Sequence, residues 1–240
     1  MCDNTAILLF TIMRIYMQYT LKQLCDFASR HENRHRQPVP GYEASHEMYI
    51  NRRSDLLFFT SNKLNKRLTD GWEFYISIKN PRQLACAWSE IQSILLDADA
   101  GPLGMAVVNI GSLTDEMMEW TYRGGTSIVI YPFVKEFKKT PIIKPRDMCD
   151  ILCRIETKLL AQNILAGEVS AAAQLVPGSQ YISLRNTYHP DLGFMASERA
   201  LTYTNPSNPL GRKNYYENIR ITTDLSASET PIGVRSRSLF

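Results

Sequence analysis

The sequence predicts an α+β fold: a mixed or antiparallel sheet with helices packed on it. Strand-like and helix-like segments interleave along the chain, with mostly short connections and no internal repeat. Residues 70–80 alternate apolar and polar side chains, and apolar residues recur at helical spacing from Pro81 onward. The 240 residues are 44% hydrophobic, which is enough to bury the core of one full domain.

The predicted strand at 70–80 has one apolar face and one polar face. The apolar face carries Trp72, Phe74, Ile76 and Ile78, and the polar face carries Glu73, Tyr75, Ser77 and Lys79. An acid, a phenol, a hydroxyl and an amine in one row are suited to binding a polar substrate. Asn80 is a good N-cap and Pro81 suits a first helical position, so a helix should follow through Leu96.

The same reasoning places the other elements. Apolar or β-branched runs predict strands at 56–60, 105–110, 126–131 and 181–186. Helical spacing predicts one or two helices within 1–29, a short helix at 113–120 and a long one at 145–166. We expect three regions: a helical N-terminal appendage and linker (1–41), a single α+β domain (42–221) and a flexible tail (222–240).

Charge and cysteine content exclude several classes of function. The chain carries 27 basic and 24 acidic residues, a net charge of +3, which predicts no nucleic-acid partner. Five cysteines without framework-like spacing indicate reduced thiols, and the four histidines suggest no metal site. The apolar run 6–13 is much shorter than the ~20 residues that span a bilayer, so we expect no membrane span. No oligomeric state follows from the sequence.

A second informative stretch lies before the strand at 126–131. Arg123 and two glycines precede a β-branched run that ends at Tyr131. The glycines let the backbone approach a ligand, and the arginine can grip an anion through a two-pronged contact. A Gly-Gly turn before a strand also needs no ligand, so both interpretations stay open. A basic loop, 135–144, follows.

The order of these segments resembles the phosphothreonine lyase family. The resemblance rests on 71–78, a strand at 105, 123–132 and 181–186, and it covers roughly residues 56–186. That family comprises type III secretion effectors that inactivate host MAP kinases, and it shares its fold with the lyase domain of class III and IV lanthionine synthetases. The resemblance implies a phosphothreonine-lyase-like fold and a virulence role on a host protein. It also implies either secretion into the host cell without a classical signal peptide or a cytoplasmic location.

The resemblance also assigns roles to individual positions. In the family, a lysine removes the α-proton of phosphothreonine, a histidine assists the leaving phosphate, and arginines hold that phosphate. Here Tyr75 stands in place of the histidine, and Ala106 stands near the lysine position. Arg123 and Arg185 match the arginines, with Arg185 in the segment Tyr-Ile-Ser-Leu-Arg-Asn. The resemblance therefore implies an anion pocket that keeps the arginines but lacks the lysine base and the histidine acid.

Three functions are open at this stage. The first is an effector-like protein with diverged chemistry, such as ADP-ribosyl transfer with NAD, and the second is an inactive module that binds phosphorylated or acidic peptides. The third is a phosphothreonine lyase with an atypical acid and base. The candidate residues are Tyr75, Glu73 and Glu198 for catalysis, Arg123, Arg185 and Lys79 for anion binding, and Trp72 and Tyr131 as an aromatic platform.

Overall fold

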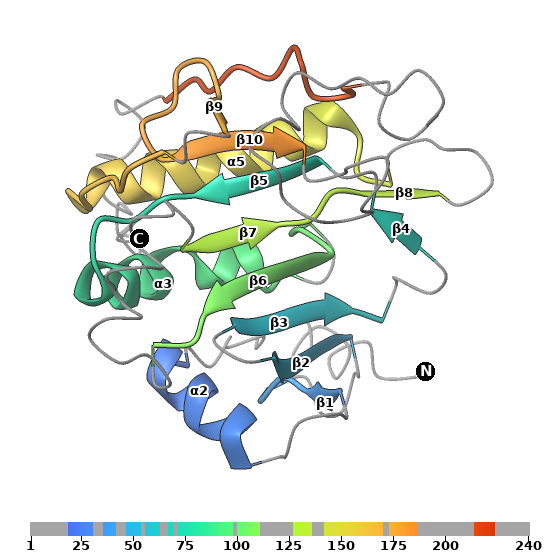
Figure 1. Ribbon diagram of the computed structural model, residues 1–240, viewed down its shortest axis with the longest axis vertical. Coiled ribbons are helices and arrows are strands. Elements are labelled where there is room, and N and C mark those ends of the chain that lie inside the picture. Colours follow the sequence, from blue (N-terminus) through green and yellow to red (C-terminus); the bar gives the residue numbers. More distant parts are fainter. Residues whose placement is uncertain are drawn as a thin grey trace, which may run out of the picture.

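The computed structural model describes residues 19–30, 36–41, 47–53, 56–62, 67–69, 72–97, 100–110, 127–135, 142–169, 173–186 and 214–223. Helices in this part of the chain are α2 (Leu21–Arg30), α3 (Pro81–Leu95) and α5 (Pro145–Ala161). Figure 1 shows α3 and α5 packed behind one face of a large sheet, and α2 beside its β1–β2 end.

The large sheet has eight strands in the order β1-β2-β3-β6-β7-β5-β10-β9, and the pairings between its described strands are antiparallel. Its strands are β1 (Gln37–Pro38), β2 (Met48–Arg53), β3 (Leu56–Ser61), β5 (Trp72–Ile76), β6 (Gly104–Val108), β7 (Ile128–Ile130), β9 (Gln174–Leu175) and β10 (Ile182–Asn186). A smaller sheet pairs β4 (Arg67–Thr69) with β8 (Phe133–Lys135). The predicted α+β class is confirmed.

Helix α3 begins as its sequence predicts. The Asn80 side chain accepts the backbone N–H of Gln83 at 2.9 Å, and Pro81 occupies the first turn. The residues at helical spacing all face the sheet and are buried: Leu84, Trp88, Ile91 and Leu95. The cap and the apolar stripe together therefore fix both the start of the helix and the face that it buries.

Helix α5 ends earlier than predicted. The sequence analysis extended it to residue 166, but the helix stops at Ala161. Asn163 adopts a left-handed conformation with φ of 52°, and the N–H of Ile164 donates to the carbonyl of Leu159. Asparagine tolerates this conformation better than most residues, so it reverses the chain and ends the helix here.

The described part of the segment 1–41 packs into the main core. Leu21 and Leu24 of α2 are buried in the cluster that also holds the residues of α3, and β1 pairs with β2. This part therefore does not stand apart as an appendage, while the predicted boundaries at 41 and 221 stay predictions. Among the described residues, no helix has the length and apolar character needed to cross a membrane.

Candidate functional site

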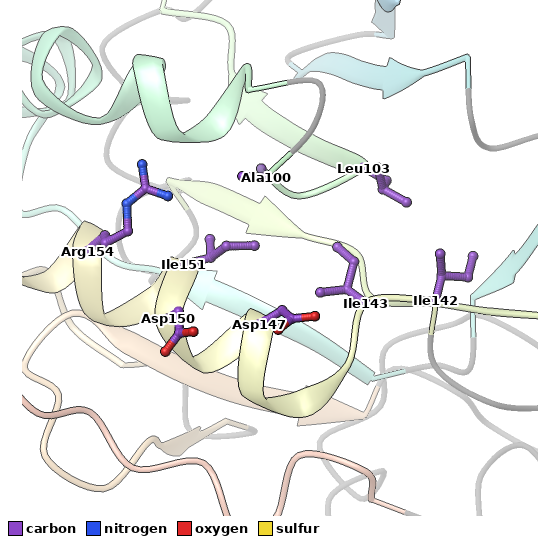
Figure 2. Close-up of a pocket in the computed structure, with 9 residues that line it drawn as sticks. Ala100, Leu103, Ile142, Ile143, Asp147, Asp150, Ile151 and Arg154 are labelled. Carbon is purple, nitrogen blue, oxygen red and sulfur yellow. The ribbon is translucent and has the colours of Figure 1, made fainter.

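A pocket of about 550 Å³ lies beside α5, and none of the predicted site residues lines it. Figure 2 shows it between the first half of α5 and the loop after α3. Its lining residues are Ala100, Gly101, Leu103, Ile142, Ile143, Asp147, Asp150, Ile151 and Arg154. Asp147 stands in the first turn of α5, where a carboxylate stabilises the helix through its dipole. That charge therefore needs no ligand to explain it.

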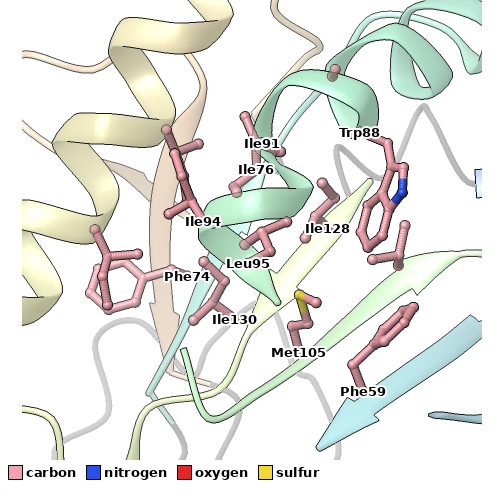
Figure 3. Packing of buried hydrophobic residues seen from close by; sticks show 14 of the residues in the cluster. Phe59, Phe74, Ile76, Trp88, Ile91, Ile94, Leu95, Met105, Ile128 and Ile130 are labelled. Carbon is pink, nitrogen blue, oxygen red and sulfur yellow. The ribbon is translucent and has the colours of Figure 1, made fainter. Parts of the chain in front are cut away.

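The strands of the large sheet turn alternate residues to opposite faces. On the face covered by α3 and α5, Phe74 and Ile76 of β5 are fully buried, as are Ile128 and Ile130 of β7. Figure 3 shows these side chains packed against the apolar side of α3. The alternation predicted for residues 70–80 is therefore confirmed on its core side.

The opposite face, which we call the site face, holds a second cluster of buried residues. Tyr75, Ala106 and Val129 pack together there, because Val129 pairs with Tyr75 on one side and with Ala106 on the other. Three partly buried residues, Leu56, Phe58 and Tyr131, pack against this cluster. Between Phe58 and Tyr75 the site face is therefore apolar, and polar side chains stand beyond both ends of this row: Asn51, the cross-strand partner of Phe58, on β2, and Glu73, Ser183 and Arg185 on β5 and β10.

Two cross-strand pairs form the polar end of the site face. Ser183 lies opposite Tyr75, and Arg185 lies opposite Glu73. The Tyr75 hydroxyl donates to the Glu73 carboxylate at 2.5 Å. Burial raises the pKa of Tyr75 far above its usual value, and the neighbouring Glu73 charge raises it further, whereas Arg185 lowers it. The phenol therefore stays protonated at neutral pH.

Two buried polar atoms at this end have no hydrogen-bond partner among the described residues: Ser183 Oγ and Arg185 Nε, here called the β10 pair. Ser183 is only 1% exposed. Leaving a buried polar group unpaired costs roughly 1–3 kcal/mol, and more for a charged one. The two groups lie two residues apart on the same face of a strand. A hydroxyl and a guanidinium in this arrangement can both donate hydrogen bonds to one anionic group.

A buried carboxylate on α5 supports the strand that carries the β10 pair. Glu156 is 0% exposed and accepts the Ser179 hydroxyl and the Gln180 N–H, both at 2.6 Å. Ser179 Oγ in turn accepts the N–H of Ile182, the first residue of β10, at 2.7 Å. Burial raises the pKa of Glu156, and these hydrogen bonds oppose that rise. The network thereby fixes where β10 begins.

The structure brings some of the predicted residues together and separates others. Glu73, Tyr75, Tyr131 and Arg185 share the site face. Lys79 is exposed and lies six residues beyond Glu73, roughly 20 Å along an extended chain. Strand β5 ends at Ile76, three residues before Lys79, so Lys79 is not among the residues that the cross-strand pairs bring together.

Trp72 also lies apart from the site. It alternates to the same side of β5 as Phe74 and packs against the main core, so it offers no platform on the site face. Arg123 and Glu198 lie outside the described residues, as does the helix expected at 113–120. The roles expected for Arg123 and Glu198 stay predictions.

Two residues of the site, Ser183 and Phe58, were not assigned to anion or ring binding from the sequence. Ser183 precedes Arg185 by two residues, so strand alternation alone would have placed it beside that arginine. Phe58 alternates with buried Leu57 and Phe59 in β3, and its ring stacks on Tyr131 with centroids 6.3 Å apart. The sequence did not reveal the strand order, which is what brings β3 near Tyr131.

The described residues contain no group of three or more His, Cys, Asp or Glu side chains placed to hold a metal ion. The site face brings together the Ser183 hydroxyl, the Tyr75 phenol, the Glu73 carboxylate and the Arg185 guanidinium. Such a set can hold an anion through hydrogen bonds, and it places a proton donor, the Tyr75 hydroxyl, beside the Glu73 carboxylate.

Comparison with known proteins supports the fold through structure and not through sequence. No family model matches this chain, and no curated protein matches it by sequence. OspF from Shigella flexneri, a type III effector and phosphothreonine lyase, is a structural match with 18% identity and a TM-score of 0.51. The match covers 72% of this chain and 92% of that chain.

Two further solved structures of phosphothreonine lyases or their effector relatives also match the fold of this chain. VirA (SpvC), the phosphothreonine lyase effector protein of Chromobacterium violaceum, is 15% identical with a TM-score of 0.53, covering 83% of this chain and 94% of that chain. The Salmonella plasmid virulence C protein, SpvC, is 14% identical with a TM-score of 0.50, covering 74% and 89%. The chain therefore has the fold of the phosphothreonine lyases, as its resemblance implied. The further likeness to lanthionine synthetases stays a prediction.

Proposed function

We propose that this chain, whose fold is that of the phosphothreonine lyases, is an effector-like protein that binds a phosphorylated segment of a host protein on its site face. The observation that carries the proposal is the β10 pair, in which Ser183 Oγ and Arg185 Nε are buried and lack partners among the described residues. A phosphoryl group supplies several acceptor oxygens, so one ligand would satisfy both donors.

We further propose that binding does not lead to the usual elimination. Ala106 stands near the position of the family's lysine base, and it is fully buried between Phe58 and Val129 on the neighbouring strands. A methyl group cannot accept the α-proton of phosphothreonine. The proposed role is therefore recognition of the phosphorylated segment.

A second candidate function is phosphothreonine lyase activity with an atypical acid and base. The contact between the Tyr75 hydroxyl and Glu73 favours it, because a protonated phenol and a carboxylate stand side by side. Glu73 would accept the α-proton and Tyr75 would protonate the leaving phosphate. Substitution Tyr75→Phe removes only the hydroxyl and should abolish turnover if this function is real.

ADP-ribosyl transfer with NAD ranks third. Of the aromatic residues expected to hold nicotinamide, Trp72 packs on the core side of β5. Tyr75 is engaged with Glu73, which leaves Tyr131 as the platform on the site face. The carboxylate at Glu198 lies outside the described residues, so no described contact favours this chemistry over phosphate binding.

Calorimetric titration with matched peptides tests the proposal. One peptide is phosphorylated and the other carries the free hydroxyl, and we expect only the first to bind. Arg185→Ala should weaken that binding roughly tenfold to a hundredfold, because hydrogen bonds to charged groups contribute about 1.5–3 kcal/mol. Arg154→Ala removes an exposed arginine from α5 and should leave the affinity unchanged, which makes it the matched control.

The same samples separate binding from catalysis. After incubation with a phosphothreonine peptide, mass spectrometry should return the peptide unchanged. Conversion to the dehydrated residue with free phosphate would instead establish the lyase function. Equal binding of both peptides, or equal affinity for wild type and Arg185→Ala, would overturn the proposed phosphate site.

A further inference from the structure

Helix α5 carries two thiols one turn apart, Cys149 and Cys153, whose sulfur atoms lie 4.0 Å apart. Both residues are partly exposed and also pack against the main core, so neither is sealed inside the protein. The helical period places them on a different face of α5 from the residues that line the pocket. Helix α5 covers the face of the sheet opposite the site face (Figure 1), so the pair is separate from the proposed phosphate site.

The described segment 214–223 packs beside these thiols. Cys149 Sγ donates a hydrogen bond to the backbone carbonyl of Arg220 at 3.4 Å. The same segment is held on the core by Tyr216, whose ring packs edge-on against Phe74. The two sulfurs therefore stand in a joint between α5 and this segment, where neighbouring backbone limits their movement.

The separation of the sulfurs fits a shared metal ion better than a disulfide. A disulfide bond is about 2.05 Å long, so its formation would require the two sulfurs to approach by about 2 Å. Metal–sulfur bonds are about 2.3 Å long, as at zinc sites, and two of them span up to about 4.6 Å between the sulfurs. The observed 4.0 Å lies inside that limit. An ion placed between the sulfurs therefore requires little movement of either side chain.

The two sulfurs select a soft ion that accepts few ligands. Thiolates favour Cu(I) and Zn²⁺, whereas Mg²⁺ and Ca²⁺ prefer oxygen ligands. Structural zinc takes four protein ligands, and the described residues include no third His, Cys, Asp or Glu placed to join the pair. Cu(I) is stable with only two or three ligands, so it is the ion that this pair fits.

We propose that Cys149 and Cys153 form a binding site for a Cu(I) ion held between their sulfurs. Each S–H bond is replaced by a bond from sulfur to copper, and the protons pass to solvent. The ion thereby also ends the hydrogen bond from Cys149 to the Arg220 carbonyl. The scattered histidines suggested no metal site, but a site of two sulfurs needs no histidine. This inference goes beyond the proposed function and does not depend on it.

Competition with a coloured Cu(I) chelator under nitrogen tests the site, on the full chain with its thiols reduced. We expect wild type to withdraw one Cu(I) ion per chain from the chelator. Cys149→Ser and Cys153→Ser each leave a single sulfur, so each should weaken binding by about a hundredfold or more, because the two sulfurs no longer act together. Cys86→Ser removes an exposed thiol of α3 and should leave the Cu(I) affinity unchanged, which makes it the matched control.

Unfolding temperatures show whether each variant is folded, and X-ray absorption at the copper edge identifies the ligand atoms in wild type without any substitution. Two sulfur neighbours around the ion would support the site. Nitrogen or oxygen neighbours without sulfur would overturn it, as would a wild-type chain that withdraws no Cu(I) from the chelator. Equal Cu(I) affinity in wild type, Cys149→Ser and Cys153→Ser would also overturn it. All of these outcomes are independent of phosphopeptide binding.

Discussion

The two faces of β5 differ in how fully their groups are paired: one face packs into the core, and the other carries the proposed binding site. Phe74 and Ile76 are fully buried against apolar neighbours. On the other side, Tyr75 bonds Glu73, and the neighbouring β10 pair includes buried polar atoms without partners among the described residues. A buried methyl group contributes to folding wherever it packs, whereas a buried unpaired hydroxyl opposes folding. This difference is the reason why we place the proposed ligand on the site face.

The largest expected effect is on the core face. Phe74→Ala removes a ring that packs edge-on against Tyr216, with centroids 5.2 Å apart. We expect the free energy of unfolding to fall by about 3–5 kcal/mol, the usual cost of deleting a buried aromatic side chain. Urea unfolding measures it. A loss below about 1 kcal/mol would mean that this face is not the core of the sheet.

Substitution of Glu156 should have a smaller effect that depends on pH. Its folded pKa is raised above the usual 4.5, so its contribution to stability is full below that value and is lost as pH rises through the folded pKa. Glu156→Gln cannot titrate and should lose about 1–3 kcal/mol with its hydrogen bonds. The stability gap between the two proteins should narrow from about pH 4 to about pH 8.

Urea unfolding of wild type and Glu156→Gln across that pH range measures the gap. Gln92 is also nearly buried, at 4% exposed, and Gln92→Glu serves as the converse control by placing a new carboxylate in α3. A gap between wild type and Glu156→Gln that widens with rising pH would contradict the raised pKa.

The smallest effect concerns binding at the polar end of the site. Glu73 lies opposite Arg185 and offsets part of its positive charge. Glu73→Gln keeps an acceptor for the Tyr75 hydroxyl and removes the negative charge, so affinity for a phosphorylated peptide should rise by up to about tenfold. Titration at two salt concentrations measures the gain, which should shrink as salt rises. An unchanged affinity would place the phosphate away from Glu73.

Much of the fold was predictable because its central elements have clear periodicity. Residues 72–78 alternate, and Asn80 with Pro81 marks the start of α3, so β5 and α3 follow from local patterns. Strand β2 was missed because its sequence, Met48–Arg53, ends in polar and basic residues that weaken the alternation. The two-residue strands β1 and β9 are too short to show any period.

The candidate site was predictable only where its residues stand in segments with a clear sequence pattern. Glu73, Tyr75 and Arg185 stand in segments whose pattern the sequence displays, and their pairing follows once β5 and β10 are neighbours. Phe58 and Glu156 were not candidates, because their roles depend on strand order and on the packing of α5 under β10. Lys79 was included because alternation was extended beyond the strand, which ends at Ile76.

The most direct test of the account is the thermal unfolding of wild type and Ser183→Ala, each with and without phenyl phosphate. Because Ser183 Oγ is buried without a described partner, its removal should stabilise the free protein by about 1 kcal/mol, or roughly 2–4 °C. The same change should reduce the stabilisation that phenyl phosphate gives to wild type. A lower unfolding temperature for Ser183→Ala, together with an undiminished response to phenyl phosphate, would contradict the account.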